Sequence, residues 1–211
     1  MTVGILLFDD VEVLDFAGPF EVFSLTAEDA VRAGRPRPFR IVLVAEDAAR
    51  PVVARGGLRV TPDVALDAAP RLDILVVPGG AGVRREFERE PLVRFLRERA
   101  PAARLVTSVC TGSMLLGRAG LLAGRRATTH WAALPWMEQA LPDTEVVADE
   151  HVVTDGDLVT SAGISAGIDM ALTVVARTCG EAVARETARQ MEYPYPEDNR
   201  RRVALPAEAR P

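Results

Sequence analysis

The sequence predicts a mostly parallel α/β sheet with helices on both of its faces. Apolar runs of strand length alternate along the chain with amphipathic stretches of helix length, which is the pattern of such a fold. The 211 residues fit one domain, and the 48% hydrophobic and 26% charged residues are ordinary for a soluble globular protein. We expect one domain over residues 1–195 and an extended, poorly ordered polar tail over 196–211.

Four strands are predicted in the first half of the chain, over residues 3–8, 39–45, 72–77 and 104–109. The helix after the first strand is expected to begin near Ala17-Gly18-Pro19, because proline is preset for a first helical turn. A second helix is predicted over 88–100, where Leu92, Phe95 and Leu96 share one face.

In the second half, helices are predicted over residues 111–119, 131–140, 163–178 and 181–192, and a short strand over 126–129. The apolar pairs 152–153 and 158–159 flank Thr154-Asp155-Gly156-Asp157. This Asp-Gly turn signature is typical of a β-hairpin.

Composition argues against several classes of function. The formal charge of −5 disfavours a nucleic-acid surface, which needs a basic patch to displace counterions. Every basic side chain is an arginine, so a P-loop lysine and a lysine Schiff base are excluded. Two cysteines and two histidines form no short-spaced zinc cluster, and we expect no metal site.

The same features bear on location. Two cysteines are a weak disulfide signal and indicate a reducing compartment. The apolar run at the N-terminus is short and lacks a basic leader, so it predicts a strand and not a signal peptide. No run approaches the ~18 apolar residues of a membrane span. We therefore expect a cytoplasmic protein without a membrane or nucleic-acid partner.

The strongest functional signal is the segment from Leu105 to Ser113, where a buried strand ends at Cys110 and a helix of small residues follows. This arrangement predicts a nucleophile elbow, a sharp turn that presents the side chain above the sheet edge. The helix N-terminus is expected to lower the pKa of the thiol and favour the reactive thiolate. A buried core cysteine is the alternative interpretation.

Pro78-Gly79-Gly80 follows the preceding predicted strand. Glycines let backbone amides point into a cleft, so the amides of Gly79 and Gly80, with that of Thr111, are candidates for an anion hole. An ordinary turn is the alternative.

Asp15 and His130 are the remaining candidates. Apolar residues follow Asp15, so its carboxyl is expected to be partly desolvated, with a raised pKa, and able to pass a proton to a thiolate or intermediate. Its alternative role is to cap the helix N-terminus. His130 is a candidate general base toward Cys110 or a substrate-binding residue, and otherwise a structural histidine. His151 is expected to face solvent.

Together these motifs resemble the ThiJ/PfpI superfamily, most closely its isonitrile hydratase branch. The resemblance extends from the first strand to about Tyr195 and rests on Asp15-x-x-Gly18-Pro19-x-Glu21, Pro78-Gly79-Gly80, Val109-Cys110-Thr111-Gly112, Ala119-Gly120-Leu121-Leu122, Thr128-Thr129-His130-Trp131 and the segment from Ser161-Ala162-Gly163 to Gly167-Ile168-Asp169.

The resemblance implies a flavodoxin-like sandwich, usually a homodimer, and a lyase that adds water to a small isonitrile without a cofactor. It implies that Cys110 attacks the isonitrile carbon to give a thioimidate, which water converts to an N-substituted formamide. Asp15 would bond the sulfur and manage the proton, and Thr111 would bind the developing nitrogen charge or the water. Thr111 and Asp15 separate this chain from relatives with histidine after the cysteine or glutamate in the first loop.

Two other functions stay open. The domain also resembles the N-terminal sensing domain of AraC-type regulators, although the sequence ends at Pro211 and a helix-turn-helix module is not expected. A stand-alone ligand sensor or a redox-responsive protein is therefore an alternative, because an acidic thiol is readily oxidised. Stress protection through glyoxalase activity is a further one.

Overall fold

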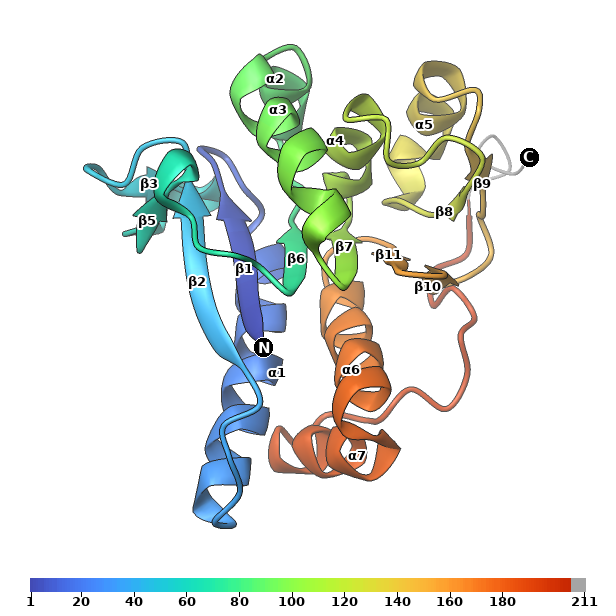
Figure 1. Ribbon diagram of the computed structural model, residues 1–211. Coiled ribbons are helices and arrows are strands. Elements are labelled where there is room, and N and C mark those ends of the chain that lie inside the picture. The colour runs from blue at the N-terminus through green and yellow to red at the C-terminus, as the bar shows by residue number, and fades with distance from the viewer. Residues whose placement is uncertain (206–211) are drawn as a thin grey trace.

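A seven-stranded sheet forms the centre of the protein, as seen in a computed structural model that describes residues 1–205 (Figure 1). Its strand order is β10-β11-β7-β6-β1-β2-β5, and every neighbouring pair is parallel except the hairpin β10–β11. The strands are β1 (Thr2–Leu7), β2 (Arg40–Ala45), β5 (Val64–Ala65), β6 (Ile74–Val77), β7 (Leu105–Val109), β10 (Val152–Asp155) and β11 (Leu158–Ser161). The predicted mostly parallel α/β fold is confirmed.

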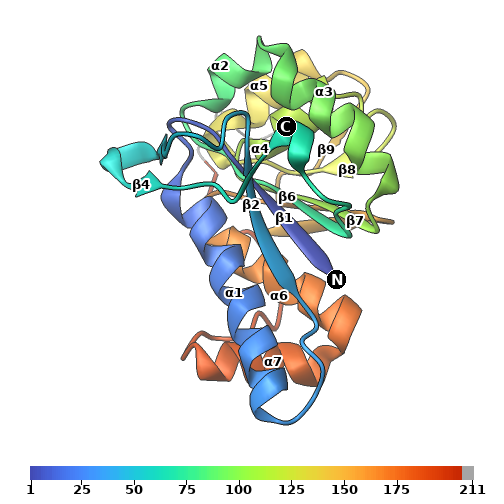
Figure 2. The ribbon, with the colours of Figure 1, turned by 60° about the vertical axis from the view of Figure 1, so that its left-hand side comes forward.

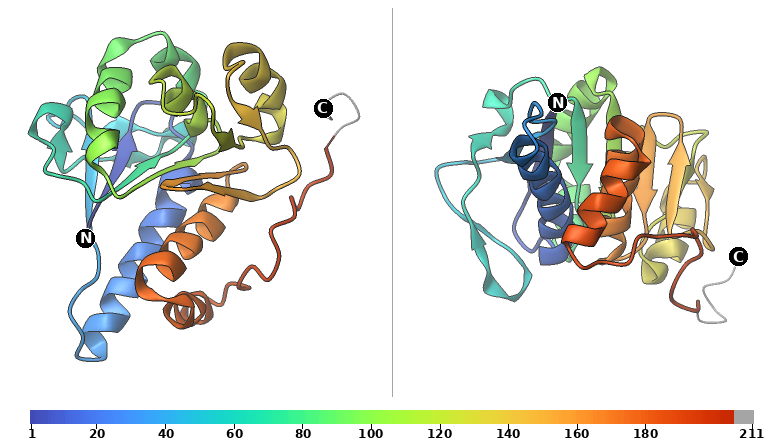
Figure 3. Two further views of the ribbon diagram at one scale, coloured as in Figure 1. Left: turned by 45° about the vertical axis from the view of Figure 1, so that its right-hand side comes forward. Right: turned by 90° about the horizontal axis from the view of Figure 1, so that it is seen from below.

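Helices cover both faces of this sheet. The helices are α1 (Val13–Arg32), α2 (Val83–Phe87), α3 (Glu90–Arg99), α4 (Gly112–Arg118), α5 (Leu134–Ala140), α6 (Ala166–Cys179) and α7 (Glu181–Gln190). Helices α1, α6 and α7 pack together below the sheet, and α2 to α5 lie above it (Figures 1 and 3). Within residues 1–205, no helix combines the length and the apolar character needed to cross a membrane.

Two small strand pairs lie outside the main sheet. One joins β3 (Val52–Val53) to β4 (Arg59–Val60) in a hairpin that projects away from the sheet (Figure 2). The other joins β8 (Arg126–Ala127) to β9 (Glu145–Val146) in parallel. The sequence did not predict four of the two-residue strands, because so short a strand shows no apolar period. These are β3, β4, β5 and β9.

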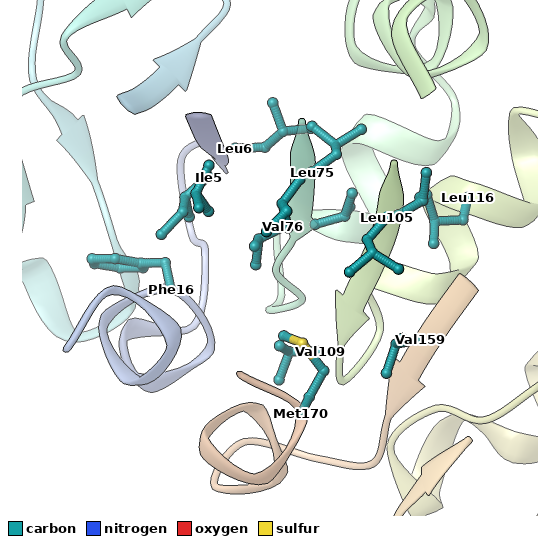
Figure 4. Close-up of a cluster of buried hydrophobic side chains, with 14 of the residues drawn as sticks. Ile5, Leu6, Phe16, Leu75, Val76, Leu105, Val109, Leu116, Val159 and Met170 are labelled. Atoms are coloured by element: carbon teal, nitrogen blue, oxygen red, sulfur yellow. The ribbon is translucent and has the colours of Figure 1, made fainter. Parts of the chain in front are cut away.

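The central strands are buried on both faces, which is why they form continuous apolar runs. In Figure 4, Phe16 of α1 and Met170 of α6 pack against the sheet from one helical layer, and Leu116 of α4 from the other. Met170 and Leu116 are fully buried, so the two layers and the sheet share one hydrophobic core.

Helix α1 begins at Val13, whereas the sequence led us to expect a start near Pro19. Proline lacks the N–H that would bond one turn back, so Pro19 removes one hydrogen bond from the helix interior. Phe16 is buried and Val13 packs against the core, and this burial favours the longer helix. The helix predicted over residues 88–100 corresponds to α3, and the separate short helix α2 precedes it.

The segment after residue 195 is extended, and its residues 199–202 contact the domain. The Arg201 guanidinium donates to Thr128 Oγ1 at 2.7 Å, and that of Arg202 lies 2.8 Å from Asp169 Oδ2. Residues 199–202 are therefore bound to the domain, because partners far away in sequence satisfy their polar groups. Residues 206–211 lie outside the described residues.

Asn199 is expected to contribute measurably to stability because it bonds both backbone groups of Val152 at the edge of β10. Its Nδ2 donates to the Val152 carbonyl at 2.7 Å, and its Oδ1 accepts from the Val152 N–H at 2.8 Å. Asn199→Ala should lower the free energy of unfolding by about 1–2 kcal/mol. Urea unfolding measures this loss, with Val203→Ala, at an exposed side chain, as the control. Equal stabilities of the two variants would contradict this role.

Candidate active site

Cys110 lies between the end of β7 and the start of α4, in a backbone conformation with φ of +56°. A positive φ at a residue other than glycine costs about 1 kcal/mol or more and needs support from the surrounding structure. The Cys110 N–H supplies it by donating to the carbonyls of Ser161 and Ala162, at 3.2 and 3.0 Å, and the Cys110 carbonyl accepts from Thr129 Oγ1 at 2.9 Å. The chain therefore makes the sharp strand-to-helix turn that the sequence predicted.

Asp15 is fully buried as the third residue of α1, and its Oδ2 accepts a hydrogen bond from the Gly79 N–H at 2.9 Å. Its other oxygen, Oδ1, has no hydrogen-bond partner among residues 1–205. The alternative of helix capping is wrong, because Glu12 occupies the N-cap position. Burial with one unpaired oxygen disfavours the charged carboxylate, so the protonated form of Asp15 is favoured.

Burial raises the pKa of Asp15 to about 8, opposed by the hydrogen bond from the Gly79 backbone and helped by the nearby charge of Glu12. At neutral pH the carboxyl is therefore protonated. The Asp15 carboxyl is close enough to Cys110 to affect the pKa of its thiol, and Cys110 carries the only sulfur in the cavity lining among the described residues.

Burial also raises the pKa of the Cys110 thiol, to about 12, and an ionised Asp15 adds to the effect. The lowered thiol pKa that the sequence led us to expect is not found, because the loss of hydration on burial outweighs the hydrogen bonds that favour the thiolate. Hydrogen bonds from the backbone of Thr111 and Ile164 and from the Thr111 hydroxyl favour the thiolate and lower this pKa. A protonated Asp15 removes the opposing charge.

Asp15 should give the free energy of unfolding a pH dependence of known sign. Its pKa rises from 3.8 in the unfolded chain to about 8 in the folded protein, so between these values only the folded state holds the proton. The contribution of Asp15 to the free energy of unfolding is fully present below the pKa of the unfolded chain. It falls by about 1.4 kcal/mol per pH unit between the two pKa values and is lost once the pH has risen through the folded-state pKa. Asp15→Asn should lack this slope in urea unfolding between about pH 5 and pH 8. Parallel pH profiles of the two proteins would contradict the raised pKa.

The backbone amides of Gly79 and Gly80 are not free, contrary to their predicted part in an anion hole. The Gly79 N–H bonds Asp15, and the Gly80 N–H donates to Thr111 Oγ1 at 3.1 Å. Both amides therefore hold side chains of the site in place. Thr111 connects the two loops, because it follows Cys110 and accepts from Gly80 at the end of β6.

Cys110, Thr111 and Gly80 line a cavity of about 320 Å³. Sequence reasoning missed most of the other lining residues, which are Glu12, Arg55, Ala81, Val83, Arg84, Ala132, Ala133, Trp136 and Ile164. They come from the first loop, the β3–β4 hairpin, the start of α2, the segment around α5 and the loop between β11 and α6. For Arg55, the sequence feature that could have indicated a turn is the pair Gly56-Gly57. Both glycines have positive φ angles, and the turn that they form brings Arg55 to the cavity.

His130 lines the same cavity, but no hydrogen bond joins it to Cys110 within residues 1–205. Its Nδ1 accepts from the Ala132 N–H at 3.2 Å and caps the turn Trp131–Ala133, so Nε2 carries the ring proton. Partial burial lowers the pKa of His130, with a smaller effect from Arg201, which keeps the ring neutral near pH 7. His130 therefore caps the turn Trp131–Ala133 and lines the cavity, and no contact with Cys110 supports a role as its general base.

His151 was expected to face solvent, and this is wrong. It is buried, and its Nε2 lies 3.1 Å from Asp169 Oδ2 on α6. Arg202 and Tyr193 also contact Asp169, so this cluster joins the C-terminal segment to the domain, and its side chains are not part of the Cys110 cavity lining. Among the described residues, no group of three histidine, cysteine or acidic side chains is arranged to hold a metal ion.

Two curated proteins cover nearly the whole chain. Isonitrile hydratase of Pseudomonas putida is 41% identical over 194 residues, which cover 92% of this chain and 78% of the hydratase. The HTH-type transcriptional regulator GbdR of Pseudomonas aeruginosa is 33% identical over 192 residues, which cover 91% of this chain. The chain spans half the length of that regulator.

Solved structures of similar fold are also found. A ThiJ/PfpI family protein from Pseudomonas syringae matches with a TM-score of 0.79 and 31% identity, covering 94% of this chain and 77% of its own. DJ-1beta of Drosophila melanogaster matches in fold, with a TM-score of 0.77 at 22% identity over 92% of this chain and 98% of its own. The family model for the DJ-1/PfpI family matches residues 1–177. The chain therefore belongs to the DJ-1/PfpI family.

Proposed function

We propose that this protein hydrates isonitriles to N-substituted formamides, with Cys110 as the nucleophile and without a cofactor. The observation that carries the proposal is the placement of two buried groups, the Cys110 thiol that lines a cavity of about 320 Å³ and the Asp15 carboxyl, which Gly79 holds beside the backbone of Thr111. The relationship to isonitrile hydratase, at 41% identity, supports the same reaction. An isonitrile carbon accepts both a nucleophile and a proton, and these two groups supply them.

In the first step, the Cys110 sulfur forms a bond to the terminal carbon of R–NC. The Asp15 carboxyl gives its proton to that carbon and takes up the proton that leaves the thiol, so the carboxyl ends the step as it began. The product is the thioimidate R–N=CH–S–Cys110. Hydrogen bonds from the backbone of Thr111 and Ile164 favour negative charge on the attacking sulfur.

In the second step, water adds to the thioimidate carbon, and one of its protons goes to the nitrogen. The carbon–sulfur bond then breaks, the hydroxyl becomes the formamide carbonyl, and its proton returns to the sulfur. We propose that Thr111, which lines the cavity beside Cys110, binds the water or the nitrogen. The sum is R–NC plus water giving R–NH–CHO.

The test is turnover of benzyl isonitrile in ¹⁸O-labelled water without added metal or cofactor. We expect N-benzylformamide that carries one ¹⁸O atom, detected by mass spectrometry, at a rate proportional to protein concentration. Heat-denatured protein measures the background reaction. Absence of labelled formamide above that background, also with cyclohexyl isonitrile, would overturn the proposed function.

A ligand-sensing role is the second candidate, and the 33% identity to the regulator GbdR over 192 residues favours it. A sensor needs tight binding and no turnover. Under this alternative, a small ligand would bind equally well to wild type and Cys110→Ser, and benzyl isonitrile would not be consumed. Binding that depends on Cys110 and leads to formamide would reject it.

We further propose that the protein acts on its small-molecule substrate as a cytoplasmic homodimer. Helix α1 leaves Leu14 and Phe20 partly exposed, each at 37%, and we propose that they belong to the contact surface of the dimer. Light scattering coupled to size-exclusion chromatography measures the mass. A monomer at micromolar concentration would contradict the dimer.

A further inference from the structure

Some of the charged side chains that line the cavity form ion pairs, and one does not. Glu12 and Arg55 form an ion pair with 2.7 Å between Oε2 and the guanidinium, so their charges offset one another. Arg84 lines the same cavity, but neither a hydrogen bond nor an ion pair within residues 1–205 occupies its guanidinium. The cavity therefore contains one uncompensated positive charge.

Arg84 is held by an aromatic contact. Its guanidinium carbon lies 4.7 Å from the ring centroid of Trp136, which in turn packs against Phe87 at 5.4 Å. This cation–π contact uses no N–H hydrogen bond, so the guanidinium N–H groups of Arg84 stay available to a ligand. These groups match a carboxylate, with two parallel hydrogen bonds. Arg84 is thus arranged to receive an anion.

The cavity lining combines a buried reactive group with an exposed charged one. Among the lining residues, Cys110 is buried at 7% exposure and Val83 is fully buried, whereas Arg84 is exposed to solvent. Ala133 and Trp136 supply apolar surface to the same lining. A molecule that fills the cavity would meet sulfur, hydrocarbon surface and a cation.

We propose that the preferred substrates are isonitriles whose hydrocarbon body ends in a carboxylate, with that carboxylate bound by Arg84 and the isonitrile carbon at Cys110. The isonitrile part rests on the proposed function. The recognition of the carboxylate rests on the unpaired charge of Arg84 and its place in the lining. Neutral isonitriles of the same shape lack this contact and are poorer substrates.

The kinetic test compares 4-(isocyanomethyl)benzoate with 4-(isocyanomethyl)benzamide, which has the same shape without the charge. In wild type, kcat/KM should favour the benzoate by about tenfold, through a lower KM, and this preference should shrink at high salt. Arg84→Gln should bring the ratio close to one. Arg94→Gln, an exposed arginine of α3 outside this cavity, is the matched control and should keep the wild-type ratio. Equal kcat/KM values in wild type, or a preference that survives Arg84→Gln, would overturn the proposal.

A binding experiment separates this inference from the proposed function. Calorimetry with 4-methylbenzoate and 4-methylbenzamide needs no isonitrile and no chemistry at Cys110. Wild type should bind the benzoate more tightly than the amide, and Arg84→Gln should bind both equally. If this holds while benzyl isonitrile is not hydrated, the anion site stands and the hydratase assignment fails. If benzyl isonitrile is hydrated but the benzoate shows no advantage in binding, the anion site fails alone.

Discussion

Replacement of Cys110 by alanine is expected to abolish isonitrile hydration while leaving the fold intact. The variant removes the sulfur that forms the covalent bond, so the rate should fall by roughly four orders of magnitude or more, to the background level. Alanine keeps the Cys110 N–H and carbonyl that bond Ala162 and Thr129, and these contacts maintain the turn. Formamide release from benzyl isonitrile, measured beside the thermal unfolding midpoint, separates lost chemistry from lost structure.

Cys179→Ala is the matched control, because this second cysteine is half-buried at the end of α6, outside the Cys110 cavity. It should keep wild-type turnover. Cys110→Ser should be nearly as inactive as the alanine variant, since a hydroxyl ionises far less readily than a thiol. Turnover by Cys110→Ala within tenfold of wild type would exclude covalent catalysis by this residue.

The largest effect on stability is expected from Gly112→Ala. A Cβ atom at Gly112 would lie 2.0 Å from the Val77 carbonyl oxygen and 2.8 Å from that of Pro78. Both are backbone atoms at the end of β6 and cannot rotate away, so α4 must shift from the sheet. We expect a loss of about 3 kcal/mol in the free energy of unfolding. Because α4 follows Cys110 and Thr111 directly, turnover should fall as well.

Gly34→Ala provides the comparison for that substitution. Gly34 has φ of +71° and no atom within 4 Å of the added Cβ, so the cost is that of the backbone conformation alone, about 1 kcal/mol. Urea unfolding of both variants measures the difference. Equal losses would show that α4 accommodates the methyl group and that close packing against β6 is unimportant.

Much of the fold was predictable because the central strands β1, β2, β6 and β7 are apolar runs that end at turn residues. The hairpin β10–β11 was also predictable, since Asp155, Gly156 and Asp157 carry a local turn signature. What escaped prediction depends on tertiary packing. The start of α1 is one case, because burial of Phe16 decides it against the preference of Pro19.

For the site, the sequence placed Cys110 at a strand end and Asp15 in the first loop, and both lie where parallel strands end at one sheet edge. The use of the glycine amides was not predictable. Gly79 bonds a carboxyl 64 residues earlier, and Gly80 bonds a hydroxyl 31 residues later. Pairings over such separations follow from the folded backbone and leave no local pattern.

His151 shows the same limit. Charged residues around it in the sequence suggested a solvated hairpin, but Asp169 of α6 and Arg202 of the C-terminal segment enclose it. Local composition describes the neighbours along the chain and not those across it. For the same reason, sequence alone does not separate the ion-paired Arg55 from Arg84, which has no ion pair among residues 1–205.

The bound C-terminal segment has a consequence for how copies of this protein can meet. Unpaired backbone groups along the outer strand of a sheet invite pairing with another chain. On one side of this sheet, Asn199 already occupies the backbone of Val152 in β10. On the other, β5 offers only two residues, directly after Pro62 and Asp63. These two features disfavour extension of the sheet from copy to copy through Val152 and through β5.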